Sequence, residues 1–403
     1  MHAHHELAAT TTRRMMIAAQ GLDRLRPAER PADILACIER MALLQIDTIH
    51  VVNRSPYWVL WSRLGNYPLQ WLDDLLADGS LFECWAHEAC FAPRGWLLAQ
   101  HRLITDRIHP TKTRWSRPFL ETHAEAATAM LALVAERGEV RSSDFRRTDG
   151  KRGTWWAWSH EKSLLEALFA DGALTVARRE RFQRVYTLAT RKHPELMTTA
   201  LPERSEVLLD QVRATMRALG VVHERWLGDY FRMRLLLQPS ARLLQERGEL
   251  IPVTLAGIPG QAWVWHEYAN WMDAPPACTH TTLLMPFDPL VWDRRRGLEA
   301  FGFDYKIECY TPAPRRVYGY FTLPVLYHDR IVGRFDCKAH RATGVFAINH
   351  AHFEADVPPD PAMYAAIATA VHRCADWHAT PVVHLTATSP TPHHAGLATA
   401  LGC

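Results

Sequence analysis

MALLQIDTIHVVNRS, residues 41–55, joins a helical pattern to an extended one, and the expected organisation of the chain follows from it. Upstream of its centre, Ile34, Ile38 and Met41 recur at helical spacing and predict one apolar face of a helix. Gln45 is the next position on that face. A polar amide placed there needs a hydrogen-bonding partner or a chemical purpose, because burying it unpaired is costly.

The residues that follow Gln45 are largely β-branched, which favours an extended path over residues 46–52. Gln45 and Asp47 lie two positions apart, so on an extended segment their side chains share one side. An amide and a carboxylate side by side are a plausible catalytic pair. The alternative is that Asp47 only caps a helix end or turn nearby, and spacing alone leaves both interpretations open.

A longer set of motifs matches a known family. The chain carries QID at residues 45–47, then Val51, Arg54 and Leu60, followed by SRLG at 62–65 and WAHEA at 85–89. In these motifs it resembles the YcaQ/AlkZ superfamily of bacterial DNA glycosylases, over about residues 7 to 350. The two branches of that family differ at the third motif position, which is Gln in one and Asp in the other. Asp47 makes the chain similar to the YcaQ-like (AlkX) branch, which implies removal of alkylated purines and unhooking of interstrand crosslinks.

The expected fold class is α+β, with tandem winged-helix units followed by a C-terminal β-rich, barrel-like domain. Helices followed by short extended runs recur along the chain, and a strand-rich region with a final helix comes after them. The expected divisions are a first winged-helix unit with the catalytic motif at 7–118, a second unit at 119–200, a third at 201–272, the C-terminal domain at 278–385 and a disordered tail at 386–403.

The second unit has the clearest local signal. Three helical patterns between residues 125 and 171 precede two extended runs, residues 174–186, around a basic tip. Between residues 141 and 193, twelve Lys and Arg residues stand against six Asp and Glu residues, a local charge of +6. Winged-helix units also serve as protein-binding modules, but this charge favours DNA.

Positive charge also gathers in residues 94–118, where six basic residues accompany Asp106 alone. Such a run forms either a solvated helix face or a surface that follows phosphates, and the one-sided sign keeps the second interpretation open. The whole chain has a formal charge of only +3, so net charge alone does not indicate a nucleic-acid partner. The residues that we predict to contact DNA are Arg114, Arg178, Arg179, Arg181, Arg316 and Arg334.

The predicted chemistry centres on Asp47. Cleavage of an N-glycosidic bond passes through an oxocarbenium-like sugar, which a carboxylate stabilises while it orients or deprotonates water. Gln45 can hold the same water or the sugar edge. An N7-alkylated purine is already cationic and leaves as a neutral base, so no second catalytic acid is required. No lysine lies in the motif, so a Schiff-base lyase step is not predicted.

Four further residues are candidates to line the site. His87 and Glu88 stand beside Trp85 in the WAHEA motif, and Arg54 follows the catalytic motif. Two titratable groups next to an aromatic are commonly a buried histidine and a paired glutamate. The family resemblance raises the alternative that they line the active-site cleft.

Several classes of protein and site are disfavoured by the sequence. The eight cysteines form no CxxC pair, which favours reduced thiols in a cytoplasmic protein. No signal peptide, membrane span, metal-ligand spacing, P-loop or GxGxxG pattern is found, so neither a membrane location nor a metal or nucleotide cofactor is expected.

The leading hypothesis is a monofunctional DNA glycosylase of base excision repair, whose partner is double-stranded DNA with alkylated or crosslinked purines. The alternative is a winged-helix transcription regulator without catalysis, which would have no need of the QID motif. An interaction scaffold is a third option, disfavoured by the clustered positive charge. A crosslinked base cannot enter a closed pocket, so we expect an open cleft and poor activity on neutral lesions such as uracil.

Overall fold

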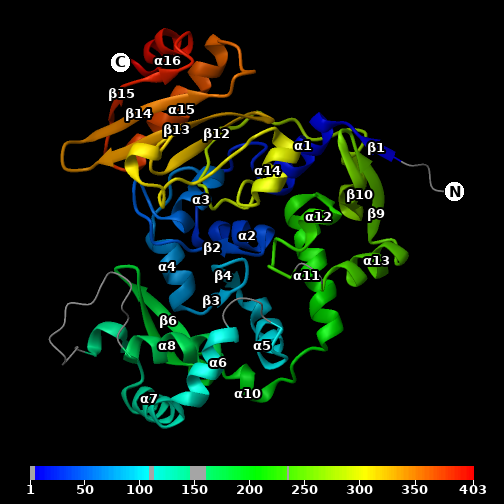
Figure 1. Cartoon of the computed structure of the whole chain (residues 1–403), viewed down its shortest axis with the longest axis vertical. Helices are drawn as coiled ribbons and strands as arrows, with labels where there is room; N and C mark the ends of the chain where they lie inside the picture. The colour runs from blue at the N-terminus through cyan, green and yellow to red at the C-terminus, as the bar shows by residue number, and fades with distance from the viewer. Residues whose placement is uncertain (1–4, 109–112, 146–159, 234–235) are drawn as a thin grey trace.

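The computed structural model describes residues 5–108, 113–145, 160–233 and 236–403. As predicted, the chain is an α+β protein in which helix-rich units with small sheets precede a larger C-terminal sheet. The first unit lies in the centre of Figure 1, with the second unit below it, the third at the right and the C-terminal domain above. None of the helices in the described part of the chain is long and apolar enough to cross a membrane.

The first unit places the QID motif, residues 45–47, between a helix and a sheet. Its elements are α2 (Pro31–Met41), α3 (Ser55–Leu64), α4 (Gln70–Ala77), α5 (Leu97–Thr105), η1 (Arg94–Trp96) and the strands β2 (Leu44–Gln45), β3 (Leu81–Trp85) and β4 (Ala89–Pro93), in the sheet order β2-β4-β3.

The predicted path of the motif is wrong in two respects. Helix α2 ends at Met41, and Ala42 has a φ of 59°, so Gln45 lies in strand β2 and not on the helical face. Strand β2 stops at Gln45. Beyond it, only the N–H of Ile46 still donates a hydrogen bond to β4, at the carbonyl of Ala89. Residues 47–54 form a loop that leads into α3.

The second unit has the predicted order of helices and hairpin. Its elements are α6 (Thr113–Thr122), α7 (Ala124–Arg137), β5 (Val140–Arg141), η2 (Ser142–Asp144), α8 (His160–Ala170), β6 (Leu174–Glu180) and β7 (Gln183–Leu188), with the sheet order β5-β7-β6. At the hairpin tip, Arg181 and Phe182 both have positive φ, 49° and 69°, which closes the turn between the two strands. The short helices α9 (Ala189–Lys192) and α10 (Glu195–Thr198) lead to the third unit.

The third unit includes the N-terminal residues, which the sequence pattern assigns to the first. Strand β1 (His5–Leu7) pairs in parallel with β9, and α1 (Ala9–Ala19) packs on α11. The remaining elements are α11 (Arg204–Leu219), β8 (Val221–His223), α12 (Glu224–Leu227), α13 (Gln238–Glu246), β9 (Leu250–Leu255), β10 (Ile258–Trp265) and η3 (His266–Trp271).

The C-terminal domain is a curled sheet that forms half of a barrel, with α15 and α16 covering its upper side in Figure 1. Its elements are β11 (Thr281–Leu283), α14 (Arg294–Phe301), η4 (Ala313–Arg315), β12 (Thr322–Tyr327), β13 (Arg330–His340), β14 (Val345–Phe353), α15 (Pro361–Trp377), β15 (Val382–Leu385), β16 (Thr388–Ser389) and α16 (His393–Leu401).

The prediction of a disordered tail at 386–403 is wrong. Strand β16 pairs with β14, and α16 packs on α15 with Leu397 and Leu401 buried. The ring of His393 stacks on Phe353 at 4.1 Å, and its Nδ1 lies 2.8 Å from the hydroxyl of Tyr364. The tail is therefore part of the C-terminal domain's core.

A buried ion pair fixes the C-terminal domain on the first unit. The guanidinium of Arg63, in α3, donates to both carboxylate oxygens of Asp288 at 2.6 and 3.0 Å, and also to the side chain of Gln20. Both members of the pair are almost fully buried, so removing either would leave an uncompensated charge in the interior. The indole of Trp58 adds a hydrogen bond to the carbonyl of Leu283. These contacts join α3, which directly follows the loop at 47–54, to the C-terminal domain.

Candidate active site

Gln45 is positioned by strand pairing and by the start of the next helix. It lies opposite Cys90 of β4, and its own carbonyl accepts a hydrogen bond from the hydroxyl of Ser55 at 2.5 Å. The side chain is buried, and its Oε1 has no hydrogen-bond partner within the residues that the structure describes. A buried acceptor without a partner costs free energy, which fits an amide reserved for a bound water or substrate.

Asp47 follows in the loop and is partly buried. Its Oδ1 accepts the N–H of Ile49 at 2.7 Å, so the local cap that is the alternative to a catalytic role does exist. Burial raises the pKa of Asp47 above its ordinary value, and the hydrogen bond from Ile49 only partly opposes this. This hydrogen bond uses only Oδ1 of Asp47. It orients the carboxylate and is compatible with a catalytic role for Oδ2.

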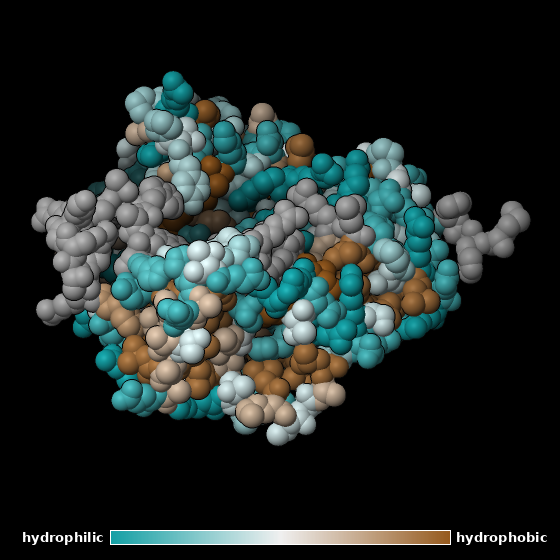
Figure 2. All heavy atoms as spheres, turned by 60° about the horizontal axis from the view of Figure 1, so that its bottom comes forward, coloured by the Kyte–Doolittle hydropathy of each residue, from teal (hydrophilic) through white to brown (hydrophobic). Residues whose placement is uncertain are grey.

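Residues of the second unit and of the C-terminal domain lie beside the loop that carries Asp47. On one side Arg54 lies over the ring of Phe182, at the tip of the second unit's hairpin, at 4.4 Å. On the side of the C-terminal domain, burial raises the pKa of Cys309, and the negative charge of Asp47 adds to this rise. Figure 2 shows that the surface is hollowed near the middle of this face of the molecule.

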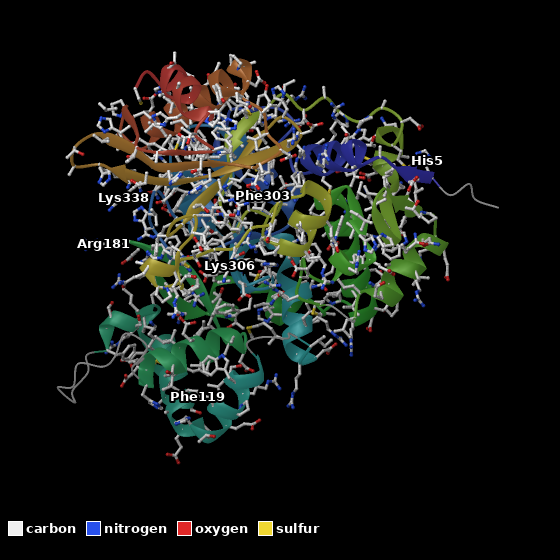
Figure 3. The ribbon with its side chains drawn as sticks, turned by 45° about the horizontal axis from the view of Figure 1, so that its top comes forward. His5, Phe119, Arg181, Phe303, Lys306 and Lys338 are labelled. Atoms are coloured by element: carbon white, nitrogen blue, oxygen red, sulfur yellow. The ribbon has the colours of Figure 1, made fainter. Side chains whose placement is uncertain are left out.

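The C-terminal sheet also reaches the catalytic loop directly. Arg341, in the turn between β13 and β14, donates to the carbonyl of Val52 at 2.5 Å. In Figure 3, Lys338 of β13 and Arg181 of the hairpin tip lie on the same side of the molecule. Both side chains are exposed, so the C-terminal domain and the hairpin tip each present a cation on this side of the molecule.

His87 and Glu88 are not brought to Asp47 by any contact seen among the described residues. The ring of His87 stacks on Trp292 at 4.0 Å, and its two nitrogens lie 3.1 Å from the carbonyl of Asp229 and from the guanidinium of Arg232. Burial, and then Arg232, lowers the pKa of His87 far below its usual range. His87 is therefore a neutral residue where the first unit meets the third unit and the C-terminal domain.

Glu88 and Trp85 also face neighbouring units. The carboxylate of Glu88 lies 3.7 Å from Arg232 and is half exposed. Trp85 packs near Phe169 of the second unit, and Arg184 lies over its ring at 5.6 Å. Of the four predicted site-lining residues, only Arg54 has a contact that bounds the opening above Asp47.

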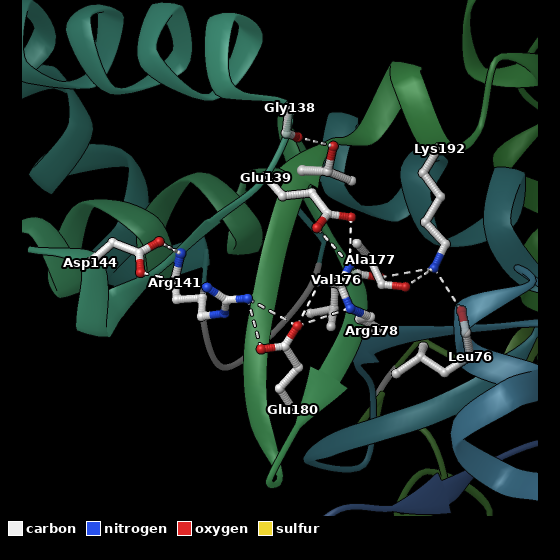
Figure 4. Close-up of polar contacts among 11 residues, drawn as sticks. Leu76, Gly138, Glu139, Arg141, Asp144, Val176, Ala177, Arg178, Glu180 and Lys192 are labelled. Carbon is white, nitrogen blue, oxygen red and sulfur yellow. Dashed lines mark hydrogen bonds and ion pairs between the residues drawn. The ribbon is translucent and has the colours of Figure 1, made fainter. Parts of the chain in front are cut away.

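The three predicted hairpin arginines have different surroundings. Arg179 is 6% exposed and pairs with the buried carboxylate of Glu83, in β3, at 2.8 Å. Arg178 pairs with Glu139 and Glu180 at 2.5 and 2.6 Å, as Figure 4 shows. Arg181 is exposed and has no ion pair among the residues of the described ranges. Arg179 thus joins the first two units and cannot also contact a phosphate, whereas Arg181 is placed to do so.

The C-terminal arginines divide in the same way. Arg334 is 2% exposed, pairs with Glu354 at 2.7 Å, and lies between the rings of Phe303 and Tyr318. Its predicted role as a DNA contact is wrong for this conformation, because the guanidinium is enclosed. Arg316 is partly exposed and donates to the carbonyl of Thr311, which leaves it near the surface.

The basic run at 94–118 is partly neutralised. Arg94, Arg102 and Arg117 pair with Glu195, Asp106 and Asp171 at 2.9, 2.9 and 3.0 Å. Arg114 belongs to α6, but its side chain lies outside the described part of the structure. Only a fraction of this run's charge is therefore left for phosphates.

Sequence reasoning missed several residues around the opening. Phe182, Tyr310, Lys306 and Lys338 carry no motif of their own, and they come from parts of the chain that are distant from Asp47. The one available signal was the basic, aromatic composition of residues 310–320. Within the described ranges, no group of three or more His, Cys, Asp or Glu residues could hold a metal ion.

Comparison with known proteins identifies the family and the fold of the chain. A family model described as DNA glycosylase AlkZ-like matches residues 38–377. Among solved structures, the DNA glycosylase AlkZ of Streptomyces sahachiroi superimposes with a TM-score of 0.62 at 18% sequence identity, covering 94% of this chain and 100% of that one. The structural likeness, at this low identity, concerns the fold.

Proposed function

We propose that this chain, which belongs to the AlkZ-like DNA glycosylase family, hydrolyses the N-glycosidic bond of N7-alkylated purines and unhooks interstrand crosslinks. Family membership makes it a DNA repair enzyme that acts on DNA. The observation that carries the finer proposal is the buried Gln45 Oε1, which has no hydrogen-bond partner among the described residues and lies two positions from the partly buried carboxylate of Asp47.

In the proposed reaction Asp47 acts as a carboxylate. The bond between C1′ and N9 breaks and its electron pair goes to the purine, which leaves as a neutral base because N7-alkylation had made it cationic. Asp47 stabilises the positive charge that develops on the sugar. A water held by the Gln45 amide attacks C1′ and gives its proton to Asp47, so no acid is needed for the leaving group.

The shape of the opening supports the proposed substrate range. Phe182 of the second unit contacts Arg54 at the end of the loop that carries Asp47, so this loop lies where two units meet. A site built between units can accept a base that remains tied to the opposite strand, whereas a closed pocket requires a free nucleotide. Because the proposed reaction supplies no acid to the leaving group, neutral lesions such as uracil should be poor substrates.

A single set of gels tests this function. The substrates are duplexes with one N7-methylguanine, one nitrogen-mustard crosslink or one uracil, treated with alkali after incubation. We expect strand breaks at the first, unhooking of the second and little release of the third. Asp47→Asn should slow single-turnover excision by about 10²–10³-fold while duplex binding is kept.

The matched control is Asp73→Asn. Asp73 lies in the same unit, its pKa is also raised by burial, and it accepts the hydroxyl of Tyr57 at 2.7 Å, which an amide oxygen still accepts. This variant should excise at nearly the wild-type rate. Efficient uracil release with intact crosslinks, or an Asp47→Asn rate within about threefold of wild type, would overturn the proposal.

A further inference from the structure

The loop at residues 308–320, between α14 and β12, displays apolar side chains to solvent. Tyr310 is 78% exposed, Val317 69% and Tyr320 39%. Single exposed apolar residues are ordinary on protein surfaces, but a cluster of them within one short loop marks an interaction site.

This loop is held rigid from within. The carboxylate of Glu308 accepts the N–H groups of Val317, Tyr318 and Gly319 at 3.0, 2.7 and 3.2 Å. Arg316 donates to the carbonyl of Thr311 at 2.8 Å and so ties the two arms of the loop together. The exposed rings are therefore presented in a fixed geometry, which lowers the entropic cost of binding.

The position of the loop connects it to catalysis. In Figure 3 the loop lies on the same side of the molecule as Arg181 of the hairpin tip, and the neighbouring residue Phe182 contacts Arg54 of the loop that carries Asp47. The loop's charge is positive on its outer side, because Arg315 is exposed, Arg316 lies over the ring of Tyr320 at 4.9 Å, and Glu308 is occupied by backbone N–H groups. Lys306, labelled in Figure 3, adds an exposed cation just before the loop.

We propose that the 308–320 loop is a stacking wedge, in which Tyr310 stacks on the base pair beside the lesion and holds the damaged nucleotide over Asp47. The proposal rests on the proposed function, since it places DNA in the same opening. A flat exposed ring suits the face of any base, and apolar side chains inserted between base steps unstack them. Arg315 and Arg316 supply the complementary charge for the adjoining phosphates. Tyr310 is then a positioning residue that does not touch the reacting bond.

The test uses the full chain and a duplex with 2-aminopurine next to a tetrahydrofuran abasic-site analogue. The fluorescence of 2-aminopurine reports its stacking, so wild-type protein should change it on binding. Tyr310→Ala should lose that change and slow single-turnover excision of N7-methylguanine by at least about fivefold. Tyr310→Phe should restore both. Met197→Ala, which removes an equally exposed apolar side chain (75%) from α10, is the control and should match wild type.

The outcomes separate the two proposals. A Tyr310→Ala protein that keeps both the fluorescence change and the excision rate overturns the wedge, whatever the lesion. If wild-type protein fails to excise N7-methylguanine but shows a fluorescence change that depends on Tyr310, the wedge stands and the proposed substrate is wrong.

Discussion

The guanidinium of Arg54 lies 4.4 Å from the centre of the Phe182 ring, and that of Arg179 lies 4.6 Å from the same ring. Arg54 thereby joins the tip of the second unit's hairpin to the loop at 47–54, whereas Arg179 lies over the same ring from the hairpin's own strand β6. Because Phe182 comes from the second unit and Arg54 from the first, this contact joins the two units beside the loop that carries Asp47.

Replacing Phe182 with Leu should therefore affect both stability and catalysis. Leucine keeps an apolar side chain but has no π face, so each cation–π contact of about 0.5–2 kcal/mol is lost. We expect a lower free energy of unfolding in urea and slower excision of N7-methylguanine. The control is Phe119→Leu in α6, which Figure 3 shows at the opposite end of the same unit from Arg181. Equal excision by both variants would mean that the hairpin tip does not shape the opening.

The pKa of Asp47 predicts the acid limb of the pH profile. Burial raises this pKa above its ordinary value of 3.8, and in the proposed reaction Asp47 acts as the carboxylate. The single-turnover rate should therefore fall as pH decreases, with a midpoint above 3.8 and a slope of one proton. The substrate's positive charge comes from alkylation and does not titrate in this range. Circular dichroism at each pH separates this limb from acid unfolding, and Asp47→Asn should abolish the limb along with most of the rate.

The buried charges between the first two units make a separate prediction about stability. Glu83 receives Arg179 at 2.8 Å and also pairs with Arg184, and all three are largely buried. Arg179→Ala breaks this network inside the protein and should cost about 3–5 kcal/mol of unfolding free energy. Arg178→Ala removes a more exposed arginine of the same strand and should cost no more than about 1 kcal/mol. Urea titrations of the two variants give the comparison, and equal costs would contradict the burial argument.

Arg181 is the hairpin arginine that should matter for DNA. Its reversal to Glu should weaken binding to any duplex and reduce the slope of log affinity against log salt by about 0.9, the value for one phosphate contact. Arg242→Glu, on the exposed side of α13, changes the net charge equally and serves as the control. Fluorescence anisotropy across a salt series measures both slopes. An unchanged slope for Arg181→Glu would place the hairpin tip away from the DNA.

The C-terminal tail should contribute to the stability of its domain. Leu397 of α16 is fully buried against α15, so Leu397→Ala should destabilise the protein by about 2–5 kcal/mol. Val382→Ala, at a half-exposed position of β15, should cost much less. Thermal or urea unfolding tests this pair. Similar stabilities would mean that the tail is only loosely attached.

Several features of the fold can be predicted from local sequence, because they depend on neighbouring residues. The helix over residues 125–137 ends at Gly138, which has a φ of 82°, a conformation that glycine adopts without strain. The alternating runs around the tip at Arg181 form the predicted hairpin. The QID motif at 45–47 likewise predicts the two polar groups of the candidate site, because the motif consists of consecutive residues.

The path of the motif and the order of the tail required tertiary information. A left-handed residue at Ala42 redirects the chain away from the helical face that spacing predicts for Gln45. The tail's Thr, Pro and His composition predicts disorder, but His393 and Leu397 find an apolar partner in α15 and β14. Local composition cannot reveal a packing surface that is contributed by a distant segment.

The sequence alone predicts a helix-rich, DNA-binding protein with an amide and a carboxylate in one short motif. It can do so because the motif and the local charge depend only on which residues are present. Which cations face DNA depends instead on how the units pack. Arg179 and Arg181 are two positions apart. Arg179 forms an ion pair with Glu83 of another unit, whereas Arg181 is exposed. The free energy of a charge depends on its burial and its partner, and both are set by segments that folding brings together.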